Sequence, residues 1–165
     1  MTDTEAKTAE TQQNQMPPLV INAQYTKDLS FEAPDAPNIF GIMQQHRPDI
    51  QINVDVKAQP CEANGKALYE VSLVATATCK VEEIVGFVLE LDYAGLFTVN
   101  VPEEHLQPML LIECPRLLFP FARNILSDVS RDGGFPPLML GPIDFVAMYQ
   151  RQLDESRDRE QKHDA

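Results

Sequence analysis

The sequence is poor in the residues that build covalently or metal-stabilised folds. It has no tryptophan and only three cysteines, at Cys61, Cys79 and Cys114. An odd number of cysteines at irregular spacing indicates neither a disulfide framework nor a zinc site. We therefore expect free thiols in a reducing cytosol and no metal or cofactor. The histidines are equally scattered, at His46, His105 and His163.

The chain also lacks a long apolar run and an excess of basic residues. No segment approaches the ~20 apolar residues of a transmembrane helix, and the N-terminus has no secretory-signal pattern. The 25 acidic residues outnumber 13 basic ones, which gives a formal charge of −12. Such a chain repels phosphate backbones and anionic lipids, which excludes nucleic acid partners and direct membrane insertion. We expect a cytoplasmic protein whose partners carry basic surfaces.

The composition fits one folded domain with polar ends. The 165 residues are 44% apolar, which is enough for a hydrophobic core that needs no disulfide or metal cross-links. Residues 1–17 contain little to bury and predict a disordered polar leader. Residues 156–165 predict a flexible charged tail, which leaves 18–155 as the folded domain.

Four segments alternate apolar and polar residues with the period of a half-buried strand. They span residues 25–32, 50–56, 69–78 and 87–93. Because they follow one another without βαβ spacing, they predict an antiparallel sheet. Asn64-Gly65 and Glu82-Glu83 predict the turns that join the last three strands. Residues 37–43 predict a short helical or looped crossover after the first strand.

The second half of the chain predicts helices. Pro102, followed by two glutamates, is a favourable start, and apolar residues at steps of three and four continue to Val129. Pro115 and Pro120 interrupt or kink this pattern, and Gly133-Gly134 ends it. A last helix is predicted from about Ile143 to Leu153. The fold class is therefore α+β, with a four-stranded antiparallel sheet and helices packed on one face.

The segment from Leu106 to Val129 has more apolar surface than one sheet covers. A main line runs through Leu118, Phe121, Ala122, Ile125 and Val129. The residues off that line are Leu111, Ile112, Leu117, Phe119 and Leu126. Since each buried Leu or Phe is worth ~2 kcal/mol, we expect this helix to lie between its own sheet and another subunit. The alternative is a helix enclosed within the monomer.

No catalytic motif is present, but charged residues gather on two predicted strands. The sequence has no GxSxG, HExxH, CxxC, P-loop or EF-hand pattern. Asp28 and Glu32 share one face of a strand, as do Glu90 and Asp92 on another, beside Val88. Together they predict a flat acidic face that docks a basic partner. The alternative is an ordinary solvated sheet face.

Large apolar residues also occur in segments rich in proline and glycine. They are Phe40, Ile42, Met43, Phe135, Leu138, Met139 and Leu140. Such residues either cover a core or, on pliable loops, line a groove for extended peptides.

Four ordered motifs in these regions resemble the SecB family of protein-export chaperones. They span Tyr25–Pro34, Glu113–Asn124, Val129–Leu140 and Pro142–Tyr149. The resemblance covers about residues 18–152. It implies a dimer of dimers with the helices between two outward-facing sheets. It also implies an ATP-independent chaperone, not an enzyme, that holds precursor proteins unfolded and delivers them to the SecA motor ATPase.

The resemblance further assigns residues to two surfaces. SecA docking maps onto Asp28, Glu32, Val88 and Glu90, where Val88 replaces the leucine that relatives often carry. The client groove maps onto Phe40, Ile42 and Met43 of the crossover and Phe135, Leu138 and Leu140 of the later loop. Two rivals stay open: a β+α protein that binds or transforms a small apolar molecule, and a purely structural oligomer.

Overall fold

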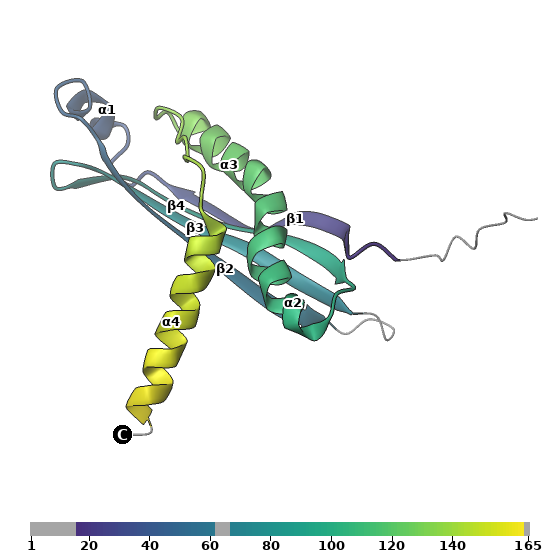
Figure 1. Ribbon diagram of the computed structural model, residues 1–165. Helices are drawn as coiled ribbons and strands as arrows, with labels where there is room; N and C mark the ends of the chain where they lie inside the picture. The colour runs from purple at the N-terminus through teal and green to yellow at the C-terminus, as the bar shows by residue number, and fades with distance from the viewer. Residues whose placement is uncertain (1–15, 62–66, 164–165) are drawn as a thin grey trace, which may run out of the picture.

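The computed structural model describes residues 16–61 and 67–163, which form four strands and a series of helices. The prediction of an antiparallel sheet with helices on one face is confirmed, and Figure 1 shows this arrangement. The elements are β1 (Leu19–Glu32), α1 (Asn38–Ile42), β2 (Asp49–Cys61), β3 (Leu68–Val81), β4 (Ile84–Val99), α2 (Glu103–Pro108), η1 (Met109–Glu113), α3 (Cys114–Asp132) and α4 (Phe145–His163).

The sheet has the strand order β1-β4-β3-β2, and every neighbouring pair is antiparallel. All four strands extend beyond the predicted segments. The predicted turn at Glu82-Glu83 is confirmed, because Val81 pairs with Ile84 and Glu82 takes a left-handed conformation with φ 55°. The predicted crossover contains α1. The Asn64-Gly65 turn and the leader up to residue 15 lie outside the described residues.

The two faces of the sheet differ in composition because side chains alternate along each strand. Val71, Leu73, Ala75 and Ala77 of β3 are buried beneath the helices, opposite equally buried residues of β4. The other face carries polar side chains, and no helix of the described chain covers it (Figure 1). We call this uncovered side the outer face.

The segments α2, η1 and α3 run without a break across the inner face. η1 is a single π-helical stretch that ends two residues before Pro115, which has no N–H to donate to a helical carbonyl. A wide turn accommodates the missing hydrogen bond without ending the helix. The predicted interruption near Pro115 is therefore a local change of helix type.

The outer surface of α3 is only partly as predicted. Leu117 and Phe121 are 39% and 51% exposed, and the Phe121 ring stacks on Tyr93 with a centroid distance of 6.2 Å. Leu126 is fully buried, which contradicts its predicted place off the main line. A helix that crosses the sheet obliquely changes its buried face along its length. A prediction based on one straight apolar stripe therefore misplaced Phe121 and Leu126.

The end of α3 positions the segment that follows it. Gly133 caps the helix and Gly134 has φ 92°, which confirms the predicted stop. Buried Ser130 donates its Oγ proton to the carbonyl oxygen of Leu126 at 2.8 Å. The same Oγ accepts a hydrogen bond from the backbone N–H of Leu138 at 2.8 Å. This side chain holds the 135–140 loop against the helix.

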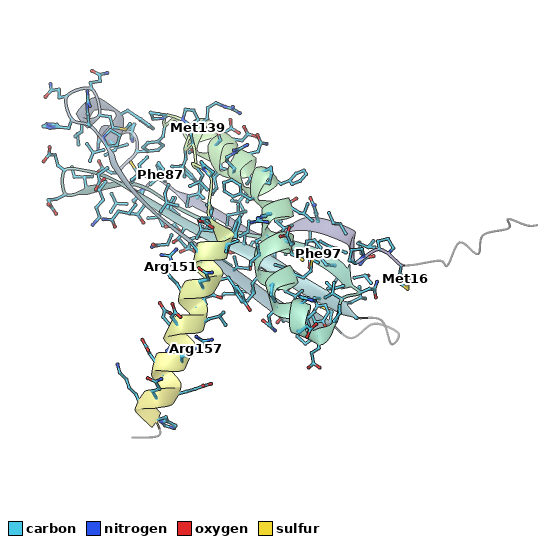
Figure 2. All side chains as sticks on the ribbon, in the orientation of Figure 1. Met16, Phe87, Phe97, Met139, Arg151 and Arg157 are labelled. Atoms are coloured by element: carbon cyan, nitrogen blue, oxygen red, sulfur yellow. The ribbon has the colours of Figure 1, made fainter. Side chains whose placement is uncertain are left out.

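α4 begins where Asp144 accepts a hydrogen bond from the N–H of Ala147 at 3.0 Å. Its anchor is Phe145, which is 2% exposed and contacts Phe119 edge-on. The predicted helix end at Leu153 was wrong. α4 continues to His163, through most of the segment assigned to a flexible tail, because its charges recur at spacings of three and four residues. Figure 2 shows α4 past Arg151 projecting from the molecule, with Arg157 far from the sheet.

Candidate functional site

The register of β1 and β4 brings the predicted docking residues together. Asp28 lies opposite Asp92, Ser30 opposite Glu90, and Glu32 opposite Val88. Directly opposed residues of an antiparallel pair project from the same face. We call the acidic residues Asp28, Glu32, Glu90 and Asp92, together with Val88, the acidic strip.

The acidic strip lies on the outer face. Asp28, Glu32 and Glu90 are exposed, whereas Val88 and Asp92 are half-buried. An irregularity between Thr26 and Asp28 adds Lys27 to β1 as an extra residue. After this bulge the strand alternates regularly, so its two acidic side chains stay on the same side as those of β4.

A hydrogen-bonded network beside the acidic strip was not predicted. Glu70 of β3 accepts a hydrogen bond from the Tyr25 hydroxyl on its Oε2 atom. Its Oε1 atom accepts from Lys27 Nζ at 2.6 Å and from Gln59 Nε2 at 3.0 Å. The bulge directs Lys27 across β4 to reach this carboxylate. One side chain thereby links β1, β2 and β3.

The network changes the acidity of its members. Hydrogen bonds from Lys27 and then Tyr25 lower the pKa of Glu70 below its ordinary value of 4.5. Burial, followed by the hydrogen bond to the glutamate, raises the pKa of Tyr25 to about 12. Glu70 is therefore ionised and Tyr25 neutral at physiological pH, which is the pairing that the geometry requires.

On the inner face, an apolar cavity of about 210 Å³ lies between the crossover and the loop after α3. Its lining is almost wholly apolar and consists of Met43, Pro48, Ile50, Cys79, Phe87, Phe135, Pro136, Pro137, Leu138 and Met139. We call this cavity the apolar groove. Met139 is 71% exposed at its rim, and the Ser127 hydroxyl contacts the Met139 sulfur at 3.6 Å.

A cluster of four phenylalanines forms one side of the apolar groove. Phe135 contacts Phe87 at a centroid distance of 4.9 Å and Phe40 at 5.3 Å, and Phe31 stacks on Phe87 at 5.4 Å. The two glycines after α3 permit this packing. A Cβ atom on Gly133 would lie 2.3 Å from the Phe31 ring, and one on Gly134 would lie 2.9 Å from Phe40.

The six predicted groove residues fall into two groups. Met43, Phe135 and Leu138 line the cavity. Phe40 contacts it through Phe135, whereas Ile42 and Leu140 pack half-buried against the core and do not line it. Met139 was also among the apolar loop residues singled out in the sequence, whereas Pro48, Ile50, Cys79 and Phe87 were missed. Their positions depend on strand pairing, which a loop pattern does not contain.

A side-chain contact joins the segment before β2 to the turn between β3 and β4. His46 Nδ1 lies 2.9 Å from Glu82 Oε1, and both side chains are largely exposed. The contact therefore stabilises the end of the molecule at which the apolar groove opens.

The two buried cysteines are poorly suited to nucleophilic chemistry. Burial raises the pKa of the Cys79 thiol, and burial followed by Glu113 raises that of Cys114 to about 12. Both thiols are therefore protonated and poorly reactive at neutral pH. Residues 16–61 and 67–163 contain no group of three or more metal-ligating side chains, and none of their helices is long and apolar enough to span a membrane.

Comparison with known families identifies the family to which the chain belongs. The family model described as "Preprotein translocase subunit SecB" matches residues 12–156. The chain belongs to the SecB family. This family membership confirms the resemblance identified from the four motifs.

Curated SecB relatives match at about half of all aligned positions. The protein-export protein SecB of Rhodospirillum rubrum is 51% identical over 142 residues, which cover 86% of each chain. That of Paramagnetospirillum magneticum is 52% identical over 147 residues, covering 89% of this chain and 93% of the relative. That of Hyphomonas neptunium is 50% identical over 165 residues and covers 98% and 96%.

A solved structure shares the fold at low sequence identity. The Mycobacterium tuberculosis Rv1957 SecB-like chaperone, in complex with a ChAD peptide from the Rv1956 HigA1 antitoxin, superimposes with a TM-score of 0.56. It is 15% identical, and the match covers 76% of this chain and 88% of that one. At this identity the likeness establishes a common SecB-like fold.

Proposed function

We propose that this SecB-family chain is a cytoplasmic, ATP-independent export chaperone that holds precursor proteins unfolded and delivers them to SecA. The observation that carries the proposal is the separation of two surfaces by the thickness of one sheet. Phe87 lines the apolar groove and Phe31 stacks on it, and the next residues along the two strands, Val88 and Glu32, lie in the acidic strip. The client therefore binds on the inner face of the sheet and the motor protein on the outer face.

The apolar groove suits an unfolded client. Flexible methionines and aromatic rings bury apolar side chains with little demand on sequence. The cavity of about 210 Å³ is smaller than the roughly 300–1,000 Å³ of small-molecule sites. This size favours single side chains of a long polypeptide over an enclosed lipid or acyl group, and so favours a chaperone over the small-molecule rival.

The acidic strip suits SecA through complementary charge. The carboxylates of Asp28, Glu32 and Glu90 are exposed on the outer face, which accelerates association with a basic partner and sets its orientation. Val88 adds a small apolar contact at one end of the strip, opposite Glu32. We assign SecA docking to Asp28, Glu32, Val88 and Glu90.

Exposed apolar residues on α3 support assembly as a dimer of dimers. Leu117 and Phe121 leave much of their apolar surface exposed on α3, although one face of the Phe121 ring stacks on Tyr93 of its own sheet. Stacking of two such helix layers would cover these residues and leave both outer faces free. Several grooves on one particle would then bind one long client with high avidity.

Client holding is tested by the refolding of a denatured secretory precursor without nucleotide. An equimolar amount of the assembled chaperone should suppress refolding. The variant Met139→Asp, which places a charge at the groove rim, should hold clients less well. The matched control Leu153→Asp changes an exposed apolar residue on the projecting part of α4 and should hold clients normally. Free refolding in the presence of the unmodified chaperone would exclude the proposal.

SecA docking is tested by charge reversal at Asp28 and Glu32. The double variant should bind SecA at least about tenfold more weakly, because opposing rim charges become like charges. Client holding by this variant should be unchanged, as SecA binding should be for Met139→Asp. Loss of both activities in either variant would show that the two surfaces are not separate.

A further inference from the structure

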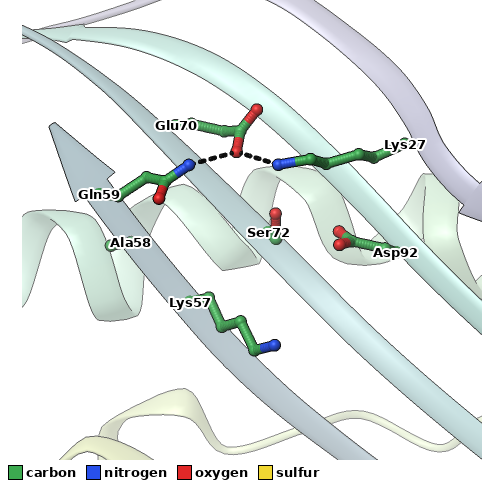
Figure 3. Close-up of a pocket in the computed structure, with 7 residues that line it drawn as sticks. All are labelled: Lys27, Lys57, Ala58, Gln59, Glu70, Ser72 and Asp92. Carbon is green, nitrogen blue, oxygen red and sulfur yellow. Dashed lines mark hydrogen bonds and ion pairs between the residues drawn. The ribbon is translucent and has the colours of Figure 1, made fainter. Parts of the chain in front are cut away.

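A second cavity, of about 170 Å³, lies on the outer face next to the acidic strip. It is lined by Lys27, Lys57, Ala58, Gln59, Glu70, Ser72 and Asp92. Figure 3 shows the Asp92 carboxylate directed toward Ser72, into the cavity, while Lys27 and Gln59 are turned to Glu70. The cavity thus holds one carboxylate that the hydrogen-bonded network does not use.

Asp92 has an unpartnered oxygen atom and faces another aspartate. Its Oδ1 atom is buried and has no hydrogen-bond partner in the described structure. Asp28 lies directly opposite on β1, and opposed like charges, whose Cβ atoms are ~5 Å apart, destabilise a strand pair. A buried acceptor without a donor adds a further cost. A single cation placed between the Asp28 and Asp92 carboxylates would remove both the repulsion and the cost of the unpartnered acceptor.

The described chain does not supply that cation. Lys27 Nζ is bound to Glu70 at 2.6 Å. Figure 3 shows Lys57 directed away from Glu70, and the described residues contain no ion pair between Lys57 and Asp92. A metal ion is disfavoured too, because the two aspartates belong to no group of three ligating side chains within the described ranges.

We propose that Asp92 is the buried anchor of the docking surface and receives a lysine or arginine side chain of SecA in this cavity. The inference rests on the proposed function, and it extends the docking surface from the exposed strip into a concave site. Asp28 flanks the incoming charge, and Ser72 and Gln59 offer additional polar contacts. Partly desolvated charge pairs near the centre of an interface contribute more than pairs at its rim.

The proposal predicts opposite effects on binding and stability. Asp92→Asn keeps the shape of the side chain but removes the charge that attracts the partner. We expect SecA to bind about tenfold more weakly or worse, since hydrogen bonds to charged groups are the strong ones. The thermal midpoint of the chaperone should stay the same or rise, because the repulsion with Asp28 is removed.

The experiment measures SecA affinity by titration calorimetry and stability by thermal unfolding. Asp55→Asn is the matched control: it makes the same charge change at an exposed position of the same sheet, outside the cavity. It should bind as the unmodified protein does. The loss in Asp92→Asn should persist at about 0.5 M salt, where the effect of exposed charges is largely screened.

Each alternative outcome is distinguishable. Unchanged affinity of Asp92→Asn, with Asp28 and Glu32 still required, overturns the anchor and leaves the proposed function intact. Absence of SecA binding by the unmodified chaperone overturns the proposed function instead. If Asp92→Asn and Lys57→Gln both lower the thermal midpoint, Asp92 is the ion-pair partner of Lys57, and the anchor is again excluded.

Discussion

Glu70 shows how much of the outer face of the sheet depends on one side chain. Its carboxylate joins residues from the first, second and third strands, and it lies beside the cavity that contains Asp92. It does so without taking part in the acidic strip itself. A change at this position therefore tests the support of the docking surface separately from its charge.

We expect Glu70→Gln to lower the free energy of unfolding at neutral pH by about 1–2 kcal/mol, because it weakens charge-assisted hydrogen bonds. The pKa of Glu70 is lowered in the folded state, so its contribution is complete above its ordinary value of 4.5. It is lost as the pH falls through the lowered value. Denaturant titrations at several acidic pH values should give a flatter dependence for the variant.

The exposed Glu83 provides the control for this prediction. Glu83→Gln removes the same charge in the turn between β3 and β4, where the Glu83 side chain makes no hydrogen bond to any other described residue. It should leave the acid side of the stability profile unchanged. An identical profile for Glu70→Gln and the unmodified chain would mean that the network does not persist in solution.

Gly133 provides a second test at the residue scale. Gly133→Ala should destabilise the fold by about 1–3 kcal/mol, because the new methyl group overlaps the Phe31 ring. Gly141→Ala is the matched control, since nothing lies within 4 Å of its added Cβ atom. The midpoints of denaturant unfolding compare the two. Equal midpoints would show that Phe31 moves aside without cost.

The residues of the acidic strip were predictable and those of the Glu70 network were not. Period-two alternation alone places Asp28 with Glu32, and Glu90 with Asp92, on common faces. The contact between Lys27 and Glu70 requires a bulge in β1 and a reach across β4. Neither feature can be predicted from the local sequence, because both depend on pairing between strands that are distant in the sequence.

At the scale of elements, α4 differs most from the sequence-based expectation. Its first turns are anchored by Phe145, but every residue from Leu153 onward that the structure describes is exposed. The apolar pattern stops where packing stops, so it gave no indication of the helical extension. Charges at favourable spacing maintain the helix beyond that point.

Removal of residues 158–165 should therefore change stability by less than about 0.5 kcal/mol. Far-ultraviolet circular dichroism should show a loss of helix, whereas the thermal midpoint should not move. Phe145→Ala is the contrasting variant and should cost about 3–5 kcal/mol, because it empties a buried aromatic site. A large drop in the midpoint of the truncated chain would show that the distal half of α4 packs on another subunit.

At the scale of the whole molecule, the exposed apolar side chains of α3 predict the oligomeric state. The native mass should be close to four times the 18.5 kDa of one chain. Leu117→Asp combined with Phe121→Asp should yield smaller particles that retain the fold, because both sites are already exposed in the monomer. Native mass spectrometry and circular dichroism check these two outcomes.

Leu153→Asp is again the control, since Leu153 is as exposed as Leu117, at 39%, but lies on the projecting helix. It should leave the mass of the particle unchanged. A stable single chain of the unmodified protein in dilute buffer would contradict the assembly. The sheet and its covered face were evident in the sequence, but the partners of α3 are a property of more than one chain.

The strand order has a consequence for how the chaperone itself matures. β1 leaves the ribosome before the other strands, yet among the described residues it pairs with β4 alone. It can therefore join the sheet only after β2, β3 and β4 have been synthesised. Asp28 and Glu32 face Asp92 and Val88 only after that late pairing. An unfinished or damaged copy therefore presents only half of the acidic strip, and under the proposed docking we expect SecA to bind it weakly.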